Sequence, residues 1–200
     1  GGIKPLENIS HVVVDEAQDY SPVQLRIIKK LYTKSRFTIM ADVNQSINAD
    51  ISITKSEDFL NIFGEKIQRV KLNKSYRSTA PINAFAFDIL GIHDPGLYID
   101  RDGKKPECIE VTHQEEAKGT VIKILENLPQ DKSVGILACD ADSAWDIKRL
   151  LGTKSVRPIQ YILAPDKSLE EKVVVMPIML AKGLEFDVVI VWDDKGKQYF

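Results

Sequence analysis

The 200-residue chain is 44% apolar and 28% charged, so it can form a sizeable core in one large domain or two small ones. Its 27 basic and 29 acidic side chains leave a net charge of −2, and any nucleic-acid binding must therefore rely on a local groove. Two cysteines without zinc-site spacing, apolar runs too short to cross a bilayer and the lack of a leader indicate a reduced, cytoplasmic protein with no membrane partner.

Short apolar runs alternate with stretches of helical spacing, which is typical of a parallel sheet covered by helices. The predicted fold class is α/β. In chain order we expect strands at residues 12–14, 37–41, 67–71, 109–111, 134–138, 173–177 and 188–192. We expect helices at residues 22–32, 56–63, 80–90, 115–128 and 141–151.

An acidic pair, Asp15 and Glu16, follows the first expected strand and precedes a helix that Ser21 and Pro22 are well suited to begin. Ligands of open parallel sheets bind at the carboxyl ends of strands, where one carboxylate can hold Mg²⁺ while the other activates a water. The alternative is that both acids are solvated and stabilise the N-terminus of the helix. The pair by itself does not decide between these interpretations.

Four ordered segments resemble the motifs of the UvrD/Rep-type superfamily 1 helicases. VVVDEAQDYSPVQ at 12–24 is similar to motif II, the Walker B element, and TIMADVNQSI at 38–47 to motif III. KLNKSYRST at 71–79 is similar to motif IV, and LAKGLEFDVVIV at 180–191 to motif V. The resemblance implies two RecA-like motor domains, the rest of a first over residues 1–66 and most of a second over residues 67–200, without a large inserted subdomain.

The resemblance also implies roles for single residues in ATP hydrolysis. Asp15 would help to coordinate Mg²⁺, Glu16 would be the general base for the attacking water, and Gln45 would sense the γ-phosphate. Tyr76 would stack on the adenine, and Arg77 would reach the γ-phosphate when the two domains close. The structural alternatives are a turn residue at Gln45, a core tyrosine at Tyr76 and a surface ion pair at Arg77.

In motif V, the resemblance implies a close backbone approach at Gly183, after Lys182, and a hydrogen bond from Glu185 to the nucleotide ribose. Without this context, the Lys-Gly-Leu-Glu sequence would be only a turn into the last expected strand.

The chain departs from the family in several places. It contains no GxxxxGK[ST] phosphate-binding loop and no visible motif VI, so we expect a fragment open at both ends that does not hydrolyse ATP alone. Motif III continues with Asn48 instead of the family's aromatic residue, which removes a platform for base stacking. Pro177 and Met179 replace the usual Thr and His of motif V, and this segment is closer to the HelD-like branch.

Three functions are compatible with these features. The first is part of an ATP-dependent helicase or translocase that acts on single-stranded or duplex DNA. The second is a HelD-like ATPase that remodels or recycles RNA polymerase. The third is a non-catalytic interaction module, which the intact Asp15, Glu16, Gln45, Tyr76 and Arg77 argue against.

Overall fold

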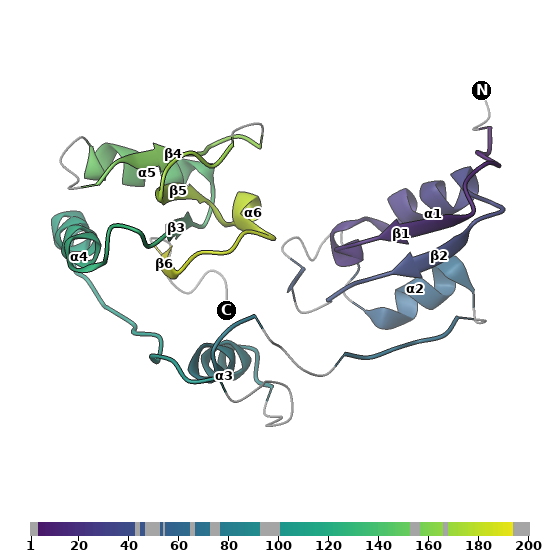
Figure 1. Cartoon of the computed structure of the whole chain (residues 1–200), viewed down its shortest axis with the longest axis horizontal. Coiled ribbons are helices and arrows are strands. Elements are labelled where there is room, and N and C mark those ends of the chain that lie inside the picture. Colours follow the sequence, from purple (N-terminus) through teal and green to yellow (C-terminus); the bar gives the residue numbers. More distant parts are fainter. Residues whose placement is uncertain are drawn as a thin grey trace. The chain divides into compact units, whose positions relative to one another are not determined.

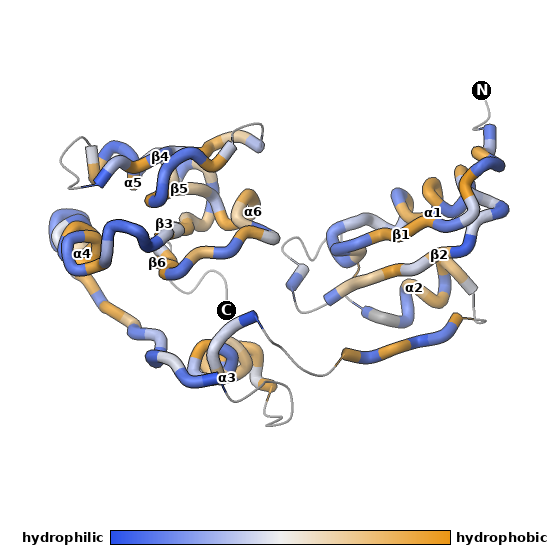
Figure 2. The backbone as a smooth tube through the Cα atoms, viewed as in Figure 1, coloured by the Kyte–Doolittle hydropathy of each residue, from blue (hydrophilic) through white to orange (hydrophobic). Residues whose placement is uncertain are grey.

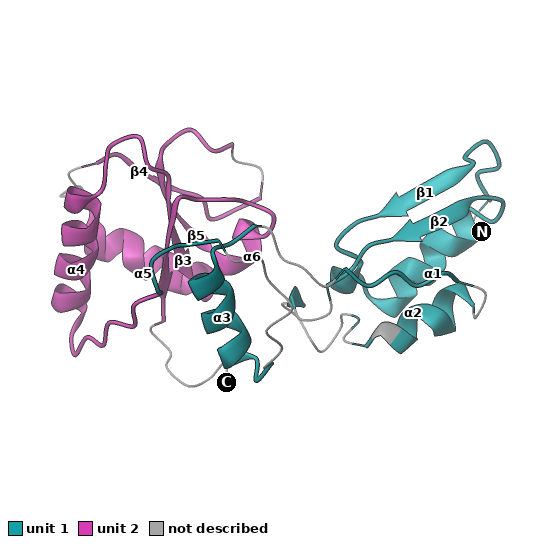
Figure 3. Ribbon diagram, turned by 60° about the horizontal axis from the view of Figure 1, so that its bottom comes forward, with its two compact units in different colours: residues 1–105 teal, residues 106–200 magenta. Residues whose placement is uncertain are grey.

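The computed structural model describes residues 4–42, 45–46, 53, 55–64, 67–72, 77–92, 101–152, 157–165 and 168–193. The chain divides into two compact units, unit 1 with residues 1–105 and unit 2 with residues 106–200 (Figure 3). Each unit contains parallel strands, and each has its own hydrophobic core.

Unit 1 contains two parallel strands, β1 (His11–Val14) and β2 (Arg36–Ile39), in which Val14 lies opposite Ile39 (Figure 1). Its helices are α1 (Pro22–Leu31), α2 (Ser56–Phe63) and α3 (Ala80–Ile89), and a short 3₁₀ helix, η1 (Ala17–Asp19), follows β1. The core is formed by β1, η1, α1, α2 and the segment before α2, through Val14, Ala17, Leu25, Ile53, Phe59 and Ile62.

Helix α1, which follows the acidic pair, begins at a well-defined N-terminal cap. Ser21 and Gln24 form a reciprocal capping box, in which the Ser21 hydroxyl accepts from the Gln24 backbone N–H at 3.3 Å and the Gln24 side chain accepts from the Ser21 N–H at 2.7 Å. The helix contains both polar and apolar residues (Figure 2) and is amphipathic. Leu25 is buried, while Lys30 is exposed. The predicted helix start at Ser21 and Pro22 is confirmed.

Unit 2 contains a four-stranded sheet in the order β4-β5-β3-β6, with every neighbouring pair parallel. Its strands are β3 (Val134–Ala138), β4 (Ile159–Tyr161), β5 (Val173–Pro177) and β6 (Val188–Trp192). Its helices are α4 (Gln114–Asn127), α5 (Ala141–Leu151) and α6 (Ile178–Ala181).

The two faces of this sheet are covered by different elements. Helices α4 and α5 contribute Val121, Leu125 and Ile147 to a core with β3 and β5. A second cluster, around Met176 on β5, includes the partly buried Phe186 from the segment between α6 and β6. Burial on both faces explains why residues 173–176 form an uninterrupted apolar run.

The prediction of an α/β fold with parallel sheets and flanking helices is confirmed, and the arrangement is consistent with a RecA-like helicase domain. Five of the predicted strands and all five predicted helices are present, with ends shifted by at most two residues. None of the helices in the described ranges is long and apolar enough to cross a membrane.

Two predicted strands are wrong. Residues 67–71 and 109–111 are not part of any strand, and Val70 and Ile109 are 71% and 52% exposed. A strand requires a hydrogen-bonded neighbour, and in the described part of the chain these segments pair with none of the six strands. The apolar residues of these two segments were therefore not sufficient to form a strand.

Two short elements, β4 and α6, were not predicted. They contain three and four residues, which is less than the window over which apolar periodicity becomes visible. The predicted division between residues 66 and 67 stays a prediction, because the two compact units do not test where one motor domain ends and the next begins. Residues 65 and 66 themselves lie outside the described part of the chain.

Candidate functional site

The loop after β1 carries the acidic pair at the carboxyl end of the strand. Asp15 is exposed, and its Oδ1 accepts a hydrogen bond of 2.8 Å from the Glu16 backbone N–H. Glu16 has φ 51° and ψ 39°, which makes it the single non-glycine residue with positive φ in the described ranges. This conformation costs about 1–3 kcal/mol for such a residue, and strain of this kind clusters at functional sites.

The side chain of Gln18, in η1, links this loop to the segment after β2. Its amide nitrogen donates to Glu16 Oε2 at 2.6 Å, while its carbonyl oxygen accepts from the Asp42 backbone N–H at 3.0 Å. The Gln18 residue is completely buried. Both halves of a buried amide therefore have partners, one in motif II and the other in motif III.

Gln45, the predicted phosphate sensor, lies on the same segment after β2. Its side-chain amide donates to Asp42 Oδ2 at 2.7 Å, and its backbone N–H donates to the Asp42 carbonyl at 3.0 Å. The two loops lie together because β1 and β2 are parallel neighbours and two backbone bonds of 2.9 Å continue the pairing, from Met40 N to Val14 O and from Ala17 N to Met40 O. The structure thus brings Asp15, Glu16 and Gln45 to one edge of the sheet.

The motif IV residues are only partly described. Tyr76 lies outside the described residues. Arg77 is exposed and lies shortly before α3, and its backbone carbonyl accepts a long hydrogen bond of 3.5 Å from Arg101. Its predicted role at the γ-phosphate stays a prediction.

In unit 2, the motif V residues lie on the segment that leads from α6 to β6. Gly183 has φ 79°, a conformation that favours glycine, and the following N–H of Leu184 donates to Ala181 O at 3.0 Å. Glu185 is exposed. The glycine therefore serves a tight turn, whereas the predicted contacts of Gly183 and Glu185 with a nucleotide stay predictions.

The last two residues of this segment hold it against the sheet. Phe186 lies over Gly135 of β3, and the Asp187 carboxylate accepts hydrogen bonds from the Ser133 backbone N–H at 2.9 Å, the Ser133 hydroxyl at 2.8 Å and Lys132 Nζ at 2.9 Å. The hydrogen bonds from Ser133 and Lys132 hold the pKa of Asp187 well below its usual range. The same carboxylate raises the pKa of Lys132.

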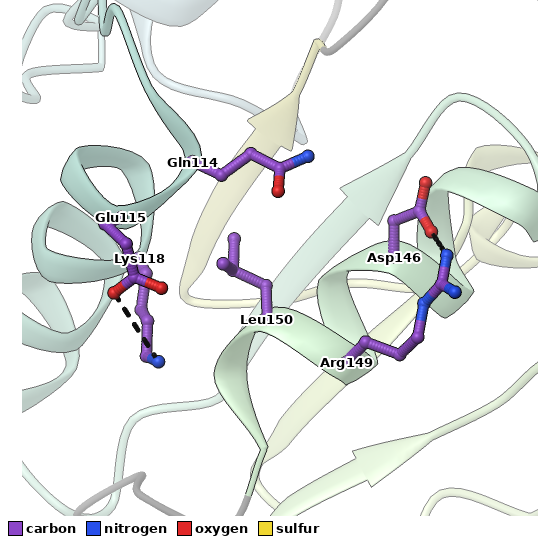
Figure 4. A pocket seen from close by; sticks show the side chains of 6 residues that line it. All are labelled: Gln114, Glu115, Lys118, Asp146, Arg149 and Leu150. Atoms are coloured by element: carbon purple, nitrogen blue, oxygen red, sulfur yellow. Dashed lines mark hydrogen bonds and ion pairs between the residues drawn. The ribbon is translucent and has the colours of Figure 1, made fainter.

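A shallow pocket of about 390 Å³ lies between α4 and α5 (Figure 4). Two ion pairs occur among its side chains, Lys118 with Glu115 and Arg149 with Asp146. Its other lining residues are Gln114 and Leu150. All six belong to α4 or α5, whereas the predicted site residues of this unit belong to the segment after α6.

The donor groups at the acidic pair fit a nucleotide-bound magnesium ion. Mg²⁺ in phosphate-transferring sites is held by one or two carboxylates together with phosphate oxygens and waters, rather than by a cage of protein ligands. An exposed Asp15 at a strand end meets this requirement. The described residues contain no cluster of three or more His, Cys, Asp or Glu that would form an all-protein site.

Sequence reasoning missed the part played by Gln18, Gly135, Phe186 and Asp187. All except Gly135 lie inside the quoted motifs II and V, and that location was the available signal. Their contacts depend on strand neighbours, which the local sequence does not reveal.

Comparisons with known proteins support the resemblance of the segment that contains motifs II and III. Residues 4–58 match the model of the UvrD/REP helicase N-terminal domain. The chain is also similar to the ATP-dependent DNA helicase srs2 of Schizosaccharomyces pombe, with 37% identity over 92 residues, which is 42% of this chain and 10% of that relative. The matched stretch is thus a small part of the relative, and the two findings together support a relationship of this chain to UvrD-type helicases.

Proposed function

We propose that this chain forms part of the motor of an ATP-dependent DNA helicase or translocase, which couples ATP hydrolysis to movement on nucleic acid. The observation that carries the proposal is the junction between the loops after β1 and β2. There a strained Glu16 next to the exposed Asp15 is joined through buried Gln18 to the segment of Gln45. The similarity of residues 4–58 to the UvrD/REP helicase N-terminal domain supports the same function.

In the proposed mechanism, Asp15 would hold Mg²⁺, and the ion would supply positive charge that neutralises the transferred phosphoryl group. Glu16 accepts the proton of the attacking water, and the Gln45 amide contacts a γ-phosphate oxygen. Arg77 would stabilise the transition state by supplying a planar and permanently charged guanidinium. Tyr76 would stack on the adenine, and Gly183 and Glu185 would contact the nucleotide from unit 2.

The 200 residues contain no GxxxxGK[ST] sequence, and such a loop supplies backbone N–H groups and a lysine to the phosphates. We therefore propose that hydrolysis belongs to a full-length protein that provides this loop, and that these residues alone are inactive. DNA, single-stranded or duplex, is the proposed polymer because the matched relative is a DNA helicase.

The experiment that tests the proposal measures phosphate release by the full-length protein with Mg²⁺ or with EDTA, in the presence and absence of single-stranded DNA. The expected result is turnover that requires Mg²⁺ and rises when DNA is added. Turnover that is absent under all conditions, or that persists in EDTA, would contradict the proposal.

A second candidate is a HelD-like ATPase that acts on RNA polymerase. The observation that favours it is in motif V, where Pro177 ends β5 and Met179 lies in α6 at the positions of the usual Thr and His. The same ATPase assay distinguishes the candidates when RNA polymerase replaces DNA. Stimulation by polymerase and not by DNA would favour the second candidate.

A further inference from the structure

Gln18 is a polar residue in a buried position, and apolar packing does not explain why a glutamine lies there. Burying a glutamine is unfavourable unless its amide finds hydrogen-bond partners, because the buried group loses its hydrogen bonds to water. Gln18 is nevertheless completely buried, next to apolar Ala17, which is also completely buried. Its cost is offset by two hydrogen bonds, and these two bonds lead to different motifs.

On one side, Gln18 holds the predicted base. Its Nε2 donates to Glu16 Oε2 at 2.6 Å, a short contact of the charge-assisted kind. A donor fixed in a buried position restricts the rotation of the carboxylate that it binds. Because Glu16 also has a left-handed backbone conformation, both its main chain and its side chain are constrained.

On the other side, Gln18 holds the segment of the predicted sensor. Its Oε1 accepts from the Asp42 N–H at 3.0 Å, and the Asp42 carboxylate in turn accepts from the Gln45 side-chain amide at 2.7 Å. The Gln18 backbone carbonyl also accepts from Ile53 N–H at 3.2 Å. One continuous set of hydrogen bonds therefore runs from Glu16 through Gln18 and Asp42 to Gln45.

We propose that Gln18 is a positioning residue that orients the Glu16 carboxylate and, through Asp42, keeps the Gln45 segment in register with it. This inference rests on the proposed function of Glu16 and Gln45. A displacement of the Gln45 segment would change the Asp42–Gln18 bond and, through the same amide, the orientation of Glu16. The hydrogen bonds thus link the group that contacts phosphate to the group that activates water.

The test is steady-state ATP hydrolysis by the full-length protein with three variants. Gln18→Met keeps the volume of the side chain and removes both hydrogen bonds, whereas Gln18→Glu keeps an acceptor for the Asp42 N–H and replaces the donor to Glu16. Asp42→Ala removes the carboxylate that holds the Gln45 side chain, at an exposed position, and keeps the backbone N–H from which Gln18 accepts. The matched control is Gln160→Met in unit 2. The Gln160 amide also donates one hydrogen bond, to the Ser168 carbonyl at 2.7 Å, and also accepts from backbone N–H groups.

All three test variants should lower kcat by about tenfold or more at pH 8, while KM for ATP changes less than about threefold, since a misplaced base impairs the transition state more than binding. Gln160→Met should keep the wild-type kcat. A purely structural Gln18 would instead leave the folded Gln18→Met and Gln18→Glu variants with the kcat of the wild type, and that result would overturn the proposal. The proposal remains testable if Gln18→Met does not fold, because Gln18→Glu is a second variant that removes the donor to Glu16 and keeps an acceptor for the Asp42 N–H.

The combination of Gln18→Glu with Asp42→Ala tests the connection itself. If one set of hydrogen bonds links these residues, the double variant should lose less kcat than the product of the single losses. A loss of kcat in the double variant that equals the product of the two single losses would contradict a shared set of hydrogen bonds. A wild-type protein without any ATP turnover would overturn the proposed function first, which separates that failure from a failure of the role of Gln18.

Discussion

The ring of Phe186 fills the space above the α-carbon of Gly135, where a Cβ atom would lie 2.7 Å from Cδ2 of the ring. Gly135 is the second residue of β3 and is paired with β5 and β6 on both sides, so its backbone cannot move away. The segment with Gly183 and Glu185 is therefore fastened to the sheet by a contact that requires glycine.

We predict that Gly135→Ala destabilises the protein by about 1–3 kcal/mol, because the added methyl group forces the Phe186 ring out of its place. Chemical denaturation measures this change in the free energy of unfolding. The matched control is Gly119→Ala in the middle of α4, where a Cβ would meet nothing within 4 Å and which should stabilise the helix by about 0.5–1 kcal/mol. Equal stability of Gly135→Ala and wild type would show that Phe186 does not hold this position.

The hydrogen bonds of Asp187 predict a dependence of stability on pH. The folded-state pKa of Asp187 lies below its ordinary value of 3.8, so its contribution to stability is present above that pH and is lost as the pH falls toward the folded-state pKa. Asp187→Asn should thus lower the thermal unfolding midpoint at pH 7, and the difference from wild type should narrow steadily below about pH 4. Glu126→Gln, an exposed carboxylate on α4, serves as the control. A difference that is constant from pH 7 to pH 3 would refute the pKa argument.

The capping box at the start of α1 predicts a further loss of stability. Ser21→Ala removes the acceptor for the Gln24 N–H and should cost about 1 kcal/mol of the free energy of unfolding. Ser21→Asp, which retains an acceptor at the cap, should remain close to wild type. The two variants are compared by urea denaturation, and similar losses in both would indicate that the hydroxyl does not cap the helix.

The fold could be predicted from sequence where pattern and burial agree. Examples are β3 and β5, which are apolar runs, and α1, which is amphipathic. In all three elements the apolar positions indicate which side chains face a core. Residues 109–111 have a strand-like pattern but pair with no strand among the residues that the structure describes, and the sequence does not reveal which strands will be neighbours. Similarly, the acidic pair could be found from its motif, whereas the burial of Gln18 and the left-handed backbone of Glu16 result from packing between β1, η1 and the segment after β2.

Arg77→Ala should separate catalysis from binding. If the guanidinium acts on the transition state, turnover by the full-length protein should fall by about a thousandfold, while affinity for a fluorescent ATP analogue falls by less than about tenfold. Arg69→Ala, another exposed arginine of unit 1, should change neither quantity appreciably. Equal losses of turnover and affinity in Arg77→Ala would assign Arg77 to simple nucleotide binding.

The most direct measurement of the proposed function is the kcat for ATP of the full-length protein with Glu16→Gln. This change keeps the shape of the side chain and removes its basicity, so kcat should fall by about a hundredfold or more while Mg²⁺-dependent ATP binding remains. Glu7→Gln, at a surface carboxylate paired with Lys34, should leave kcat unchanged. Undiminished hydrolysis by Glu16→Gln would contradict the assignment of Glu16 as the base and, with it, the catalytic interpretation of the loop after β1.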